Sequence, residues 1–227
     1  SGAQRVQVVL TETSEQGLTA SVYSQPAESL ADAAWTLHAT ARIGKEAVAE
    51  PVPLNLAELQ ARCREAQAMG SVYERFAELG LAYGPGFQGM HSLWTKAGEA
   101  LAEVALPSGS PNEGFGIHPV LLDSAVQALV AATGAEAAGE LFLPFEMGRF
   151  TVYQEGAEAC WVHIRIHPRE GVSGLVADMT LMDTRGVVVA EVLRLRLQRA
   201  DREALRRSDA KAQSDSLYRL VWQEAQV

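Results

Sequence analysis

The chain opens with three short segments in which apolar and polar residues alternate. Residues 6–10, 18–24 and 35–43 are rich in Val, Thr, Tyr and Trp, and polar turns separate them. Alternation with a period of two and this composition are typical of antiparallel strands. We therefore expect a small sheet at the start of the chain.

Two stretches with helical signals follow. Asn55 with Glu58, and Ser71 with Glu74, each have the spacing of a capping box. In that motif a short polar side chain and an acidic residue three positions later pair with the free N–H groups of a helix start. The helices predicted from these caps span residues 56–68 and 72–79.

Strand patterns return after Phe87 and are interrupted by one long apolar stretch, 119–133. A proline at its first position and Gly134 just past its end are the usual residues at the two ends of a helix. Tight turns are predicted at 96–99 and 183–186. The strands predicted in this part span 87–95, 100–106, 141–153, 159–167, 174–183 and 187–198.

Composition narrows the class of protein. Of 227 residues 48% are hydrophobic, enough for a globular core, and 28 acidic against 19 basic residues give a net charge of -9. Nucleic acid is not an expected partner, because the basic surface it requires is missing. No apolar run approaches the roughly eighteen residues of a membrane span, and residues 1–5 have no signal-peptide character. We expect a cytoplasmic piece of a longer protein.

The cysteines and histidines predict no metal site. Cys63 and Cys160 lie far apart in the sequence and form no C-x-x-C pair, so neither a zinc site nor a disulfide framework is indicated. His163 and His167 would share one face of a strand about 13 Å apart. That distance is too long for two ligands of one metal ion.

One carboxylate interrupts the apolar helix. Between 119 and 132 the polar residues are Asp123, Ser124 and Gln127. An unsatisfied buried polar group costs about 1–3 kcal/mol and a bare charge considerably more. Gln127 lies four residues beyond Asp123 on the same helix face, where its amide could hydrogen-bond the carboxyl.

Two interpretations of Asp123 remain open at this point. The side chain could face a polar seam or solvent, or stabilise the first part of the helix through the macrodipole. Alternatively, an enclosed carboxyl favours its protonated form and can donate a proton, as an acid catalyst must. The residues alone indicate a type of chemistry and no substrate.

Three local motifs resemble the dehydratase domains of modular type I polyketide synthases. Residues 83–88 (YGPGFQ) match the family's YGPxF motif, and residues 118–127 (HPVLLDSAVQ) match its HPxxLDxxxQ motif. Residues 217–222 (LYRLVW) are similar to the start of the ketoreductase structural subdomain that often follows. The family's histidine motif, HxxxGxxxxP, is missing, since none of the five histidines is followed by Gly and Pro at these spacings.

The resemblance implies an α+β double hot-dog fold, in which each of two antiparallel sheets wraps around a long central helix. The first hot-dog would be incomplete in this chain. The implied division assigns 1–50 to the last strands of the first hot-dog, 51–80 to connecting helices, 81–199 to the second hot-dog with the aspartate helix, and 200–227 to a linker toward the next domain.

The resemblance also implies a reaction, the elimination of water from a 3-hydroxyacyl thioester on an acyl carrier protein to give a trans-2-enoyl thioester. Asp123, held by Gln127, would protonate the departing hydroxyl. The histidine that removes the α proton would lie upstream of Ser1, so the chain alone would be inactive. Backbone N–H groups near a helix start would polarise the thioester carbonyl.

Further residues are expected along the acyl and pantetheine channel on the same resemblance. Simpler roles stay open for several of them: 84–86 could be a turn before a strand, His118 a helix cap, and Phe145 part of the core. The candidate substrate-binding residues are Tyr83, Gly86, Phe87, His118, Pro119, Leu143, Pro144 and Phe145.

The implied partners are the acyl carrier protein, the other domains of the same synthase and a second copy in a homodimer. No cofactor of the domain's own is implied, because the substrate is carried on the phosphopantetheine of the carrier protein. The arginines at 194–207 could contact an acidic carrier or be a solvated strand face. Alternative functions are a catalytically silent acyl or carrier-binding or dimerisation module, and a hot-dog thioesterase or isomerase.

Overall fold

The computed structural model describes residues 3–12, 17–28, 33–44, 48–110, 112, 114–133, 141–167 and 174–200. These residues form two compact units, one within Ser1–Ala49 and one within Glu50–Arg206. The predicted linker beyond Ala200, the segment 217–222 and Gly134 lie outside the described residues. No helix of the described part has the length and apolar content needed to cross a membrane.

The first unit is a three-stranded antiparallel meander. Its strands are β1 (Gln4–Glu12), β2 (Leu18–Pro26) and β3 (Thr36–Ile43), in that order, so the predicted strands are confirmed with their ends moved by one or two residues. Val6 and Leu10 are 59% and 60% exposed. Three strands bury little apolar surface by themselves, so this sheet has no full core of its own.

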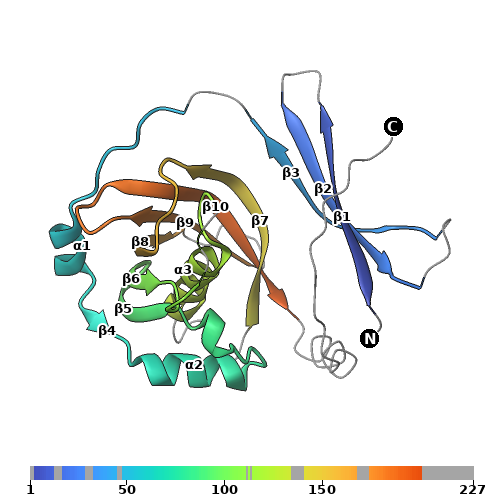
Figure 1. Ribbon diagram of the computed structural model, residues 1–227. Helices are drawn as coiled ribbons and strands as arrows, with labels where there is room; N and C mark the ends of the chain where they lie inside the picture. The colour runs from blue at the N-terminus through green and yellow to red at the C-terminus, as the bar shows by residue number, and fades with distance from the viewer. Residues whose placement is uncertain are drawn as a thin grey trace. The chain divides into compact units, whose positions relative to one another are not determined.

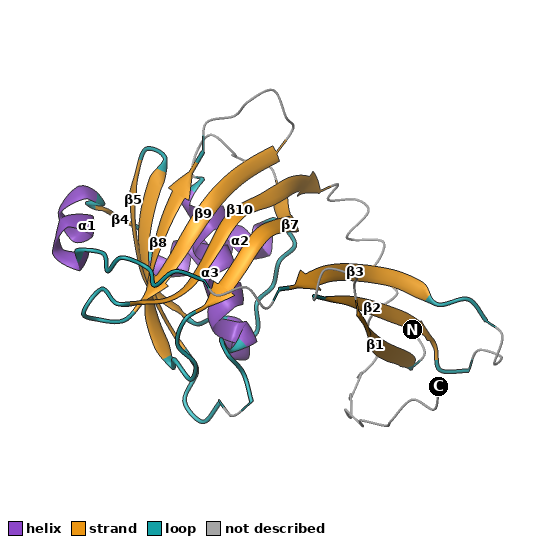
Figure 2. Ribbon diagram, turned by 90° about the horizontal axis from the view of Figure 1, so that it is seen from above, coloured by secondary structure: helices purple, strands orange, loops and turns teal. Residues whose placement is uncertain are grey.

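The second unit is a curved antiparallel sheet around one long helix, α3 (Pro119–Ala132), as Figures 1 and 2 show. The sheet order is β4-β5-β6-β8-β9-β10-β7. This arrangement is the hot-dog fold expected for this part of the chain. The strands are β4 (Glu65–Ala66), β5 (Met90–Lys96), β6 (Glu99–Ala105), β7 (Leu141–Val152), β8 (Ala159–Ile166), β9 (Gly174–Met182) and β10 (Val188–Ala200).

The core lies between α3 and the concave face of this sheet. Leu121, Ala125, Ala128 and Leu129 of α3 are completely buried, and residues on alternate positions of the strands pack against them. Burial of one large apolar side chain contributes about 1.5–3 kcal/mol. A helix enclosed in this way is apolar on nearly every side, which is the pattern read from the sequence.

The helix predicted over 56–68 is shorter, α1 (Leu56–Arg62). Its cap is confirmed, because the Asn55 side chain accepts the N–H of Glu58 and donates to the Glu58 carboxylate. The helix ends at Arg62 because Cys63 is extended and the chain then pairs as β4 with β5. Strand pairing therefore overrides the helical pattern of the following residues.

The second predicted cap is wrong. Helix α2 (Met69–Glu78) begins at Met69 with Ala68 as its cap, so Ser71 lies inside the helix. Val72 and Phe76 are its buried residues, and the earlier start adds Met69 to the same apolar face. Packing against the core decides the helix start here.

The strand predicted from Phe87 begins at Met90, because a 3-10 turn, η1 (Pro85–Phe87), precedes it.

Helix α1 covers part of the other face of the sheet. Leu59 and Cys63 pack against Leu101 and Met182, with Trp94 and Trp161 beside them. Leu101 points away from α3, because Ala100 and Ala102 on either side of it belong to the central core. The connection 51–68 is thus fixed to the outside of the sheet.

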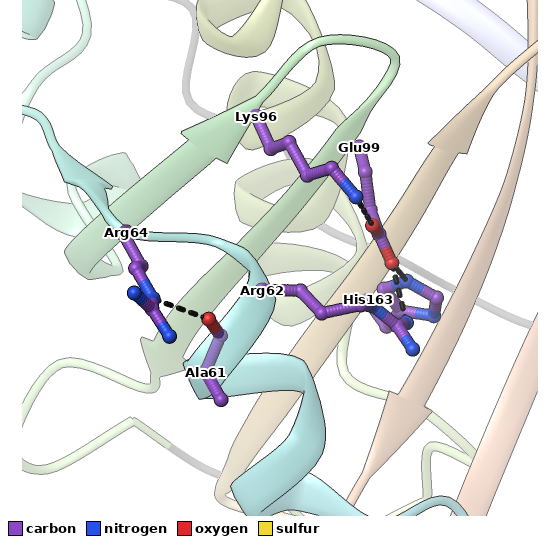
Figure 3. Close-up of polar contacts among 6 residues, drawn as sticks. All are labelled: Ala61, Arg62, Arg64, Lys96, Glu99 and His163. Atoms are coloured by element: carbon purple, nitrogen blue, oxygen red, sulfur yellow. Dashed lines mark hydrogen bonds and ion pairs between the residues drawn. The ribbon is translucent and has the colours of Figure 1, made fainter.

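A polar cluster at Glu99 joins α1 to this outer face (Figure 3). Glu99 Oε1 lies 2.6 Å from Arg62 Nη2 and 2.7 Å from His163 Nε2, and Lys96 Nζ lies 3.7 Å from Oε2. Burial raises the pKa of Glu99, but hydrogen bonds from Arg62 and His163 outweigh it and leave the pKa below its usual value. Burial lowers the pKa of His163, and Glu99 offsets this only in part.

Both shifts predict a loss of stability on acidification. Because its pKa is lowered, His163 stays neutral in the folded chain at a pH where it is already protonated in the unfolded chain. As the pH falls through about 6.5, the unfolded chain therefore takes up a proton that the folded chain does not, and the unfolded state is favoured. Glu99 adds a further loss below about 4.5, because its folded carboxylate resists protonation. The free energy of unfolding, measured by urea denaturation, should therefore fall between pH 7 and pH 5. The variant His163→Gln, which can still donate to Glu99, should show a smaller fall in that window; an identical fall would contradict the assignment.

Candidate active site

The carboxyl of Asp123 is bonded to the amide of Gln127 one helical turn later. Gln127 Nε2 donates to Asp123 Oδ2 at 2.7 Å, which is the hydrogen bond predicted from the four-residue spacing. Gln127 is 1% exposed, whereas Asp123 is partly buried. The helix thus holds the amide inside the core and lets the carboxyl reach the edge of it.

Gln127 makes a second hydrogen bond, to the backbone carbonyl of Phe87 at 2.9 Å. Both bonds come from Nε2, whose two hydrogens can serve two acceptors. Gln127 Oε1 is buried without a hydrogen-bond partner among the described residues. The amide therefore connects Asp123 to the turn η1, which carries part of the YGPGFQ motif.

This geometry decides which carboxyl oxygen can carry a transferable proton. Asp123 Oδ2 accepts an N–H from Gln127, so the proton of the neutral carboxyl belongs on Oδ1. After loss of that proton, the same N–H stabilises the carboxylate. The pair can therefore donate one proton in a fixed direction, which is what general acid catalysis requires.

Two tyrosines lie in the same region. The rings of Tyr73 and Tyr83 are 6.4 Å apart, edge to face, and Phe76 packs against both. Burial raises the pKa of Tyr83 to about 12, and the charge of Asp123 adds to the shift. Burial also raises the pKa of Tyr73, where the Met90 N–H acts in the opposite direction and Asp123 again raises it. Both phenols are therefore neutral O–H groups near neutral pH, and the charge of Asp123 acts on both.

His118 caps α3. Its Nδ1 accepts the N–H of Val120 at 3.1 Å, and its carbonyl accepts the N–H groups of Leu121 and Leu122. The ring lies edge to face with Phe115, with centroids 4.9 Å apart. An accepting Nδ1 places the ring hydrogen on Nε2. The capping role considered for His118 is observed, and Pro119 occupies the first helical position as predicted.

The remaining candidates lie in two places. Tyr83 is partly buried, whereas Gly86 and Phe87 are exposed in or beside η1, which contacts α3. Residues 143–145 lie on β7, one of the two edge strands of the sheet. Phe145 is 66% exposed, so the alternative of a core position for Phe145 is wrong. The structure therefore places the η1 group in contact with the Asp123 helix.

The histidines that were considered as metal ligands have other partners. His163 contacts Glu99, and His167 Nε2 lies 3.0 Å from Asp178 Oδ2. Among the residues that the structure describes, no group of three or more His, Cys, Asp or Glu side chains is arranged to hold a metal ion.

The sequence motifs did not identify Tyr73 or Gly89. Tyr73 falls on the apolar side of α2 beside Phe76, a position typical of ordinary core residues. Gly89 packs so closely against α3 that a Cβ atom there would lie 2.6 Å from Ser124 Oγ. A lone glycine before a strand signals close backbone approach, but it does not identify the neighbour.

A family model described as the polyketide synthase dehydratase N-terminal domain matches residues 51–207. Mycoketide-CoA synthase of Mycobacterium tuberculosis is 32% identical over 227 residues, covering 98% of this chain and 5% of that protein. Polyketide synthase GfsA of Streptomyces halstedii is 31% identical over 230 residues, covering 100% of this chain and 3% of that protein. The chain thus spans a small part of these curated relatives.

Solved structures of dehydratase domains are also similar to this chain. The dehydratase domain from the CurK module of curacin polyketide synthase superposes with a TM-score of 0.77 at 27% identity, covering 89% of this chain and 69% of that one. Two inactive mutants of CurK dehydratase, one with His replaced by Phe and one with Asp replaced by Asn, superpose with the same TM-score. From the family match over 51–207 and these likenesses, the chain belongs to the polyketide synthase dehydratase family.

Proposed function

We propose that this chain supplies the acid half of a dehydratase site that eliminates water from a 3-hydroxyacyl thioester, giving a trans-2-enoyl thioester. The thioester is carried on the phosphopantetheine arm of an acyl carrier protein. The observation that carries the proposal is the 2.7 Å hydrogen bond from buried Gln127 to the carboxyl of Asp123, in a chain of the dehydratase family.

In the proposed reaction a histidine from outside this chain removes the α proton. The electrons of that C–H bond form the new double bond between the α and β carbons, and the β carbon–oxygen bond breaks. The departing hydroxyl takes the proton from Asp123 Oδ1 and leaves as water. The carboxylate that remains keeps the N–H of Gln127 on Oδ2, which lowers the energy of the charge formed.

The CurK structures support this division of roles. Replacing one His by Phe, or one Asp by Asn, gives CurK dehydratase mutants that are called inactive. A reaction that needs one base and one acid loses activity when either is removed. In the present chain Asp123 is the aspartate with a dedicated buried partner, so we assign the acid to it.

The thioester carbonyl must be polarised by donors other than the start of α3. His118 already accepts the N–H groups of Val120, Leu121 and Leu122, and Pro119 has none to give. The N–H groups at the start of this helix are therefore already hydrogen-bonded to the capping residue. The donors belong to another segment of the complete site, which is consistent with a site shared with the upstream half of the domain.

The acyl and pantetheine channel is proposed to pass η1. Gly86 and Phe87 are exposed there, and the charge of Asp123 adds to the rise that burial causes in the pKa of Tyr83. His118, Pro119 and residues 143–145 remain proposed substrate contacts. The carrier protein, the other synthase domains and a homodimeric partner are proposed partners, and the domain is proposed to need no cofactor beyond the carrier's phosphopantetheine.

The variant Asp123→Asn tests the acid. In a protein that contains this chain and its upstream sequence, kcat for dehydration of a 3-hydroxyacyl pantetheine thioester should fall by about 10²–10⁴-fold, the usual contribution of a general acid. The asparagine oxygen can still accept from Gln127, so the urea midpoint should change little. The control Glu103→Gln removes a carboxylate from the outer face of the sheet and should leave kcat unchanged. Full activity in Asp123→Asn would reassign the acid.

The missing base predicts a difference between two lengths of the protein. The 227-residue chain alone should show no turnover of the same thioester, because the proposed base is not part of it, whereas a protein extended upstream to include the histidine motif should be active. Product formation is followed by the absorbance of the conjugated enoyl thioester. Turnover by the chain alone would contradict the proposal that the site is shared with the upstream half.

A further inference from the structure

We propose that Tyr73 is a positioning residue for the proposed dehydration, acting on Asp123 through the segment 87–90 and Gln127. This inference rests on the proposed function. In it, the Tyr73 hydroxyl fixes Met90, the segment that begins at Phe87 is fixed with it, and the Phe87 carbonyl then sets the Gln127 amide that orients Asp123.

The first link is between α2 and the start of β5. The Tyr73 ring is held by edge or tilted contacts with Phe76, at 6.1 Å, and Tyr83, at 6.4 Å. Its hydroxyl accepts the N–H of Met90 at 3.2 Å. Met90 is the first residue of β5 and is almost completely buried. This N–H would otherwise be an unsatisfied buried donor, so Tyr73 determines where the segment enters the sheet.

The second link is the absence of free space at Gly89. A Cβ atom there would lie 2.6 Å from Ser124 Oγ and 2.7 Å from the Ala105 carbonyl oxygen. The Gly89 carbonyl also accepts the N–H of Ala105. The segment is therefore held between α3 and β6, and a shift at Met90 cannot be absorbed before it reaches Phe87.

The third link is the Gln127 amide. Its Nε2 donates to Phe87 O at 2.9 Å and to Asp123 Oδ2 at 2.7 Å. If the amide turned over, Oε1 would face two acceptors, so the Phe87 carbonyl fixes the orientation of the amide. A change of about 1 Å in the position of a catalytic group can cost roughly 10²-fold in rate. The position of Phe87 therefore matters for Asp123.

Electrostatics agree with this placement. Burial raises the pKa of Tyr73, and the Asp123 charge acts in the same direction. The Tyr73 hydroxyl is thus poorly solvated and within range of the Asp123 charge. Tyr73 remains a neutral phenol across the working range of pH, so its acceptor role toward Met90 does not change during turnover.

A double-mutant cycle tests the proposal in the upstream-extended protein. Tyr73→Phe keeps the ring packing and removes the acceptor of the Met90 N–H. We expect kcat to fall about tenfold with KM changed less than about twofold, because positioning acts on the chemical step. In a Gln127→Leu background the same substitution should change kcat less than about twofold. Tyr73 is proposed to act on Asp123 only through Gln127, so its effect disappears once that amide is removed. An equal fall of kcat in both backgrounds, or a change in KM with kcat unaffected, would overturn the proposal.

Two controls separate positioning from general damage. Tyr153→Phe removes a hydroxyl that is bonded to Glu191 at 2.7 Å, outside this series, and should leave kcat unchanged. Hydrogen exchange at the Met90 amide should be slow in the parent protein and faster in Tyr73→Phe, and slow exchange in the variant would overturn the first link. Asp123→Asn measured alongside distinguishes the two ideas: if it stays active both fail, whereas an inactive Asp123→Asn with additive Tyr73 and Gln127 effects removes only the Tyr73 proposal.

Discussion

The amide of Gln127 is the constraint on which the site depends. A buried amide that lost its acceptors would cost about 1–3 kcal/mol, so the fold must keep the Phe87 carbonyl and the Asp123 carboxyl within reach of Nε2. One side chain thereby connects the central helix, a short turn and the Asp123 carboxyl. Two residues after this turn, Gly89 approaches Ser124 so closely that no Cβ atom would fit between them.

The sheet and helix create the conditions for that constraint. The concave face of the sheet covers α3 almost completely, and nine of its residues are buried. Asp123, near the start of the helix and partly exposed, can reach beyond the core while Gln127 cannot. His118 accepts the first N–H groups of the helix, so the start of α3 needs no external ligand for its own stability.

Much of this could be predicted from the sequence because its signals are local. The alternating strands, the apolar helix from Pro119, the cap at Asn55 and the bond between Asp123 and Gln127 each depend on residues a few positions apart. The predictions that were wrong depend on contacts between residues far apart in the sequence. Ser71 has the residues of a cap, but burial of Val72 and Phe76 moves the helix start to Met69, and the helix from Leu56 ends where β4 pairs with β5.

The hydrogen bonds of the Tyr73 hydroxyl and of the Phe87 carbonyl could not be predicted for the same reason. Tyr73 has the spacing of a core residue, and nothing nearby in the sequence reveals that its hydroxyl meets the N–H of Met90 seventeen residues later. Phe87 acts through its backbone carbonyl, forty residues from Gln127. A backbone acceptor is common to all residues, so no residue type could have marked it.

Two carboxylates of this unit have partners of different charge. Glu99 accepts hydrogen bonds from the Arg62 guanidinium and from His163, and these two partners outweigh burial and hold the pKa of Glu99 below its usual value. Such a group fixes α1 to the sheet but does not readily take up a proton near neutral pH. Asp123 is instead oriented by a neutral amide, which can hydrogen-bond the carboxyl in both its protonated and its ionised form. Under the proposed function, in which Asp123 gives up and regains a proton in every turnover, a neutral amide is a better partner for it than a salt bridge.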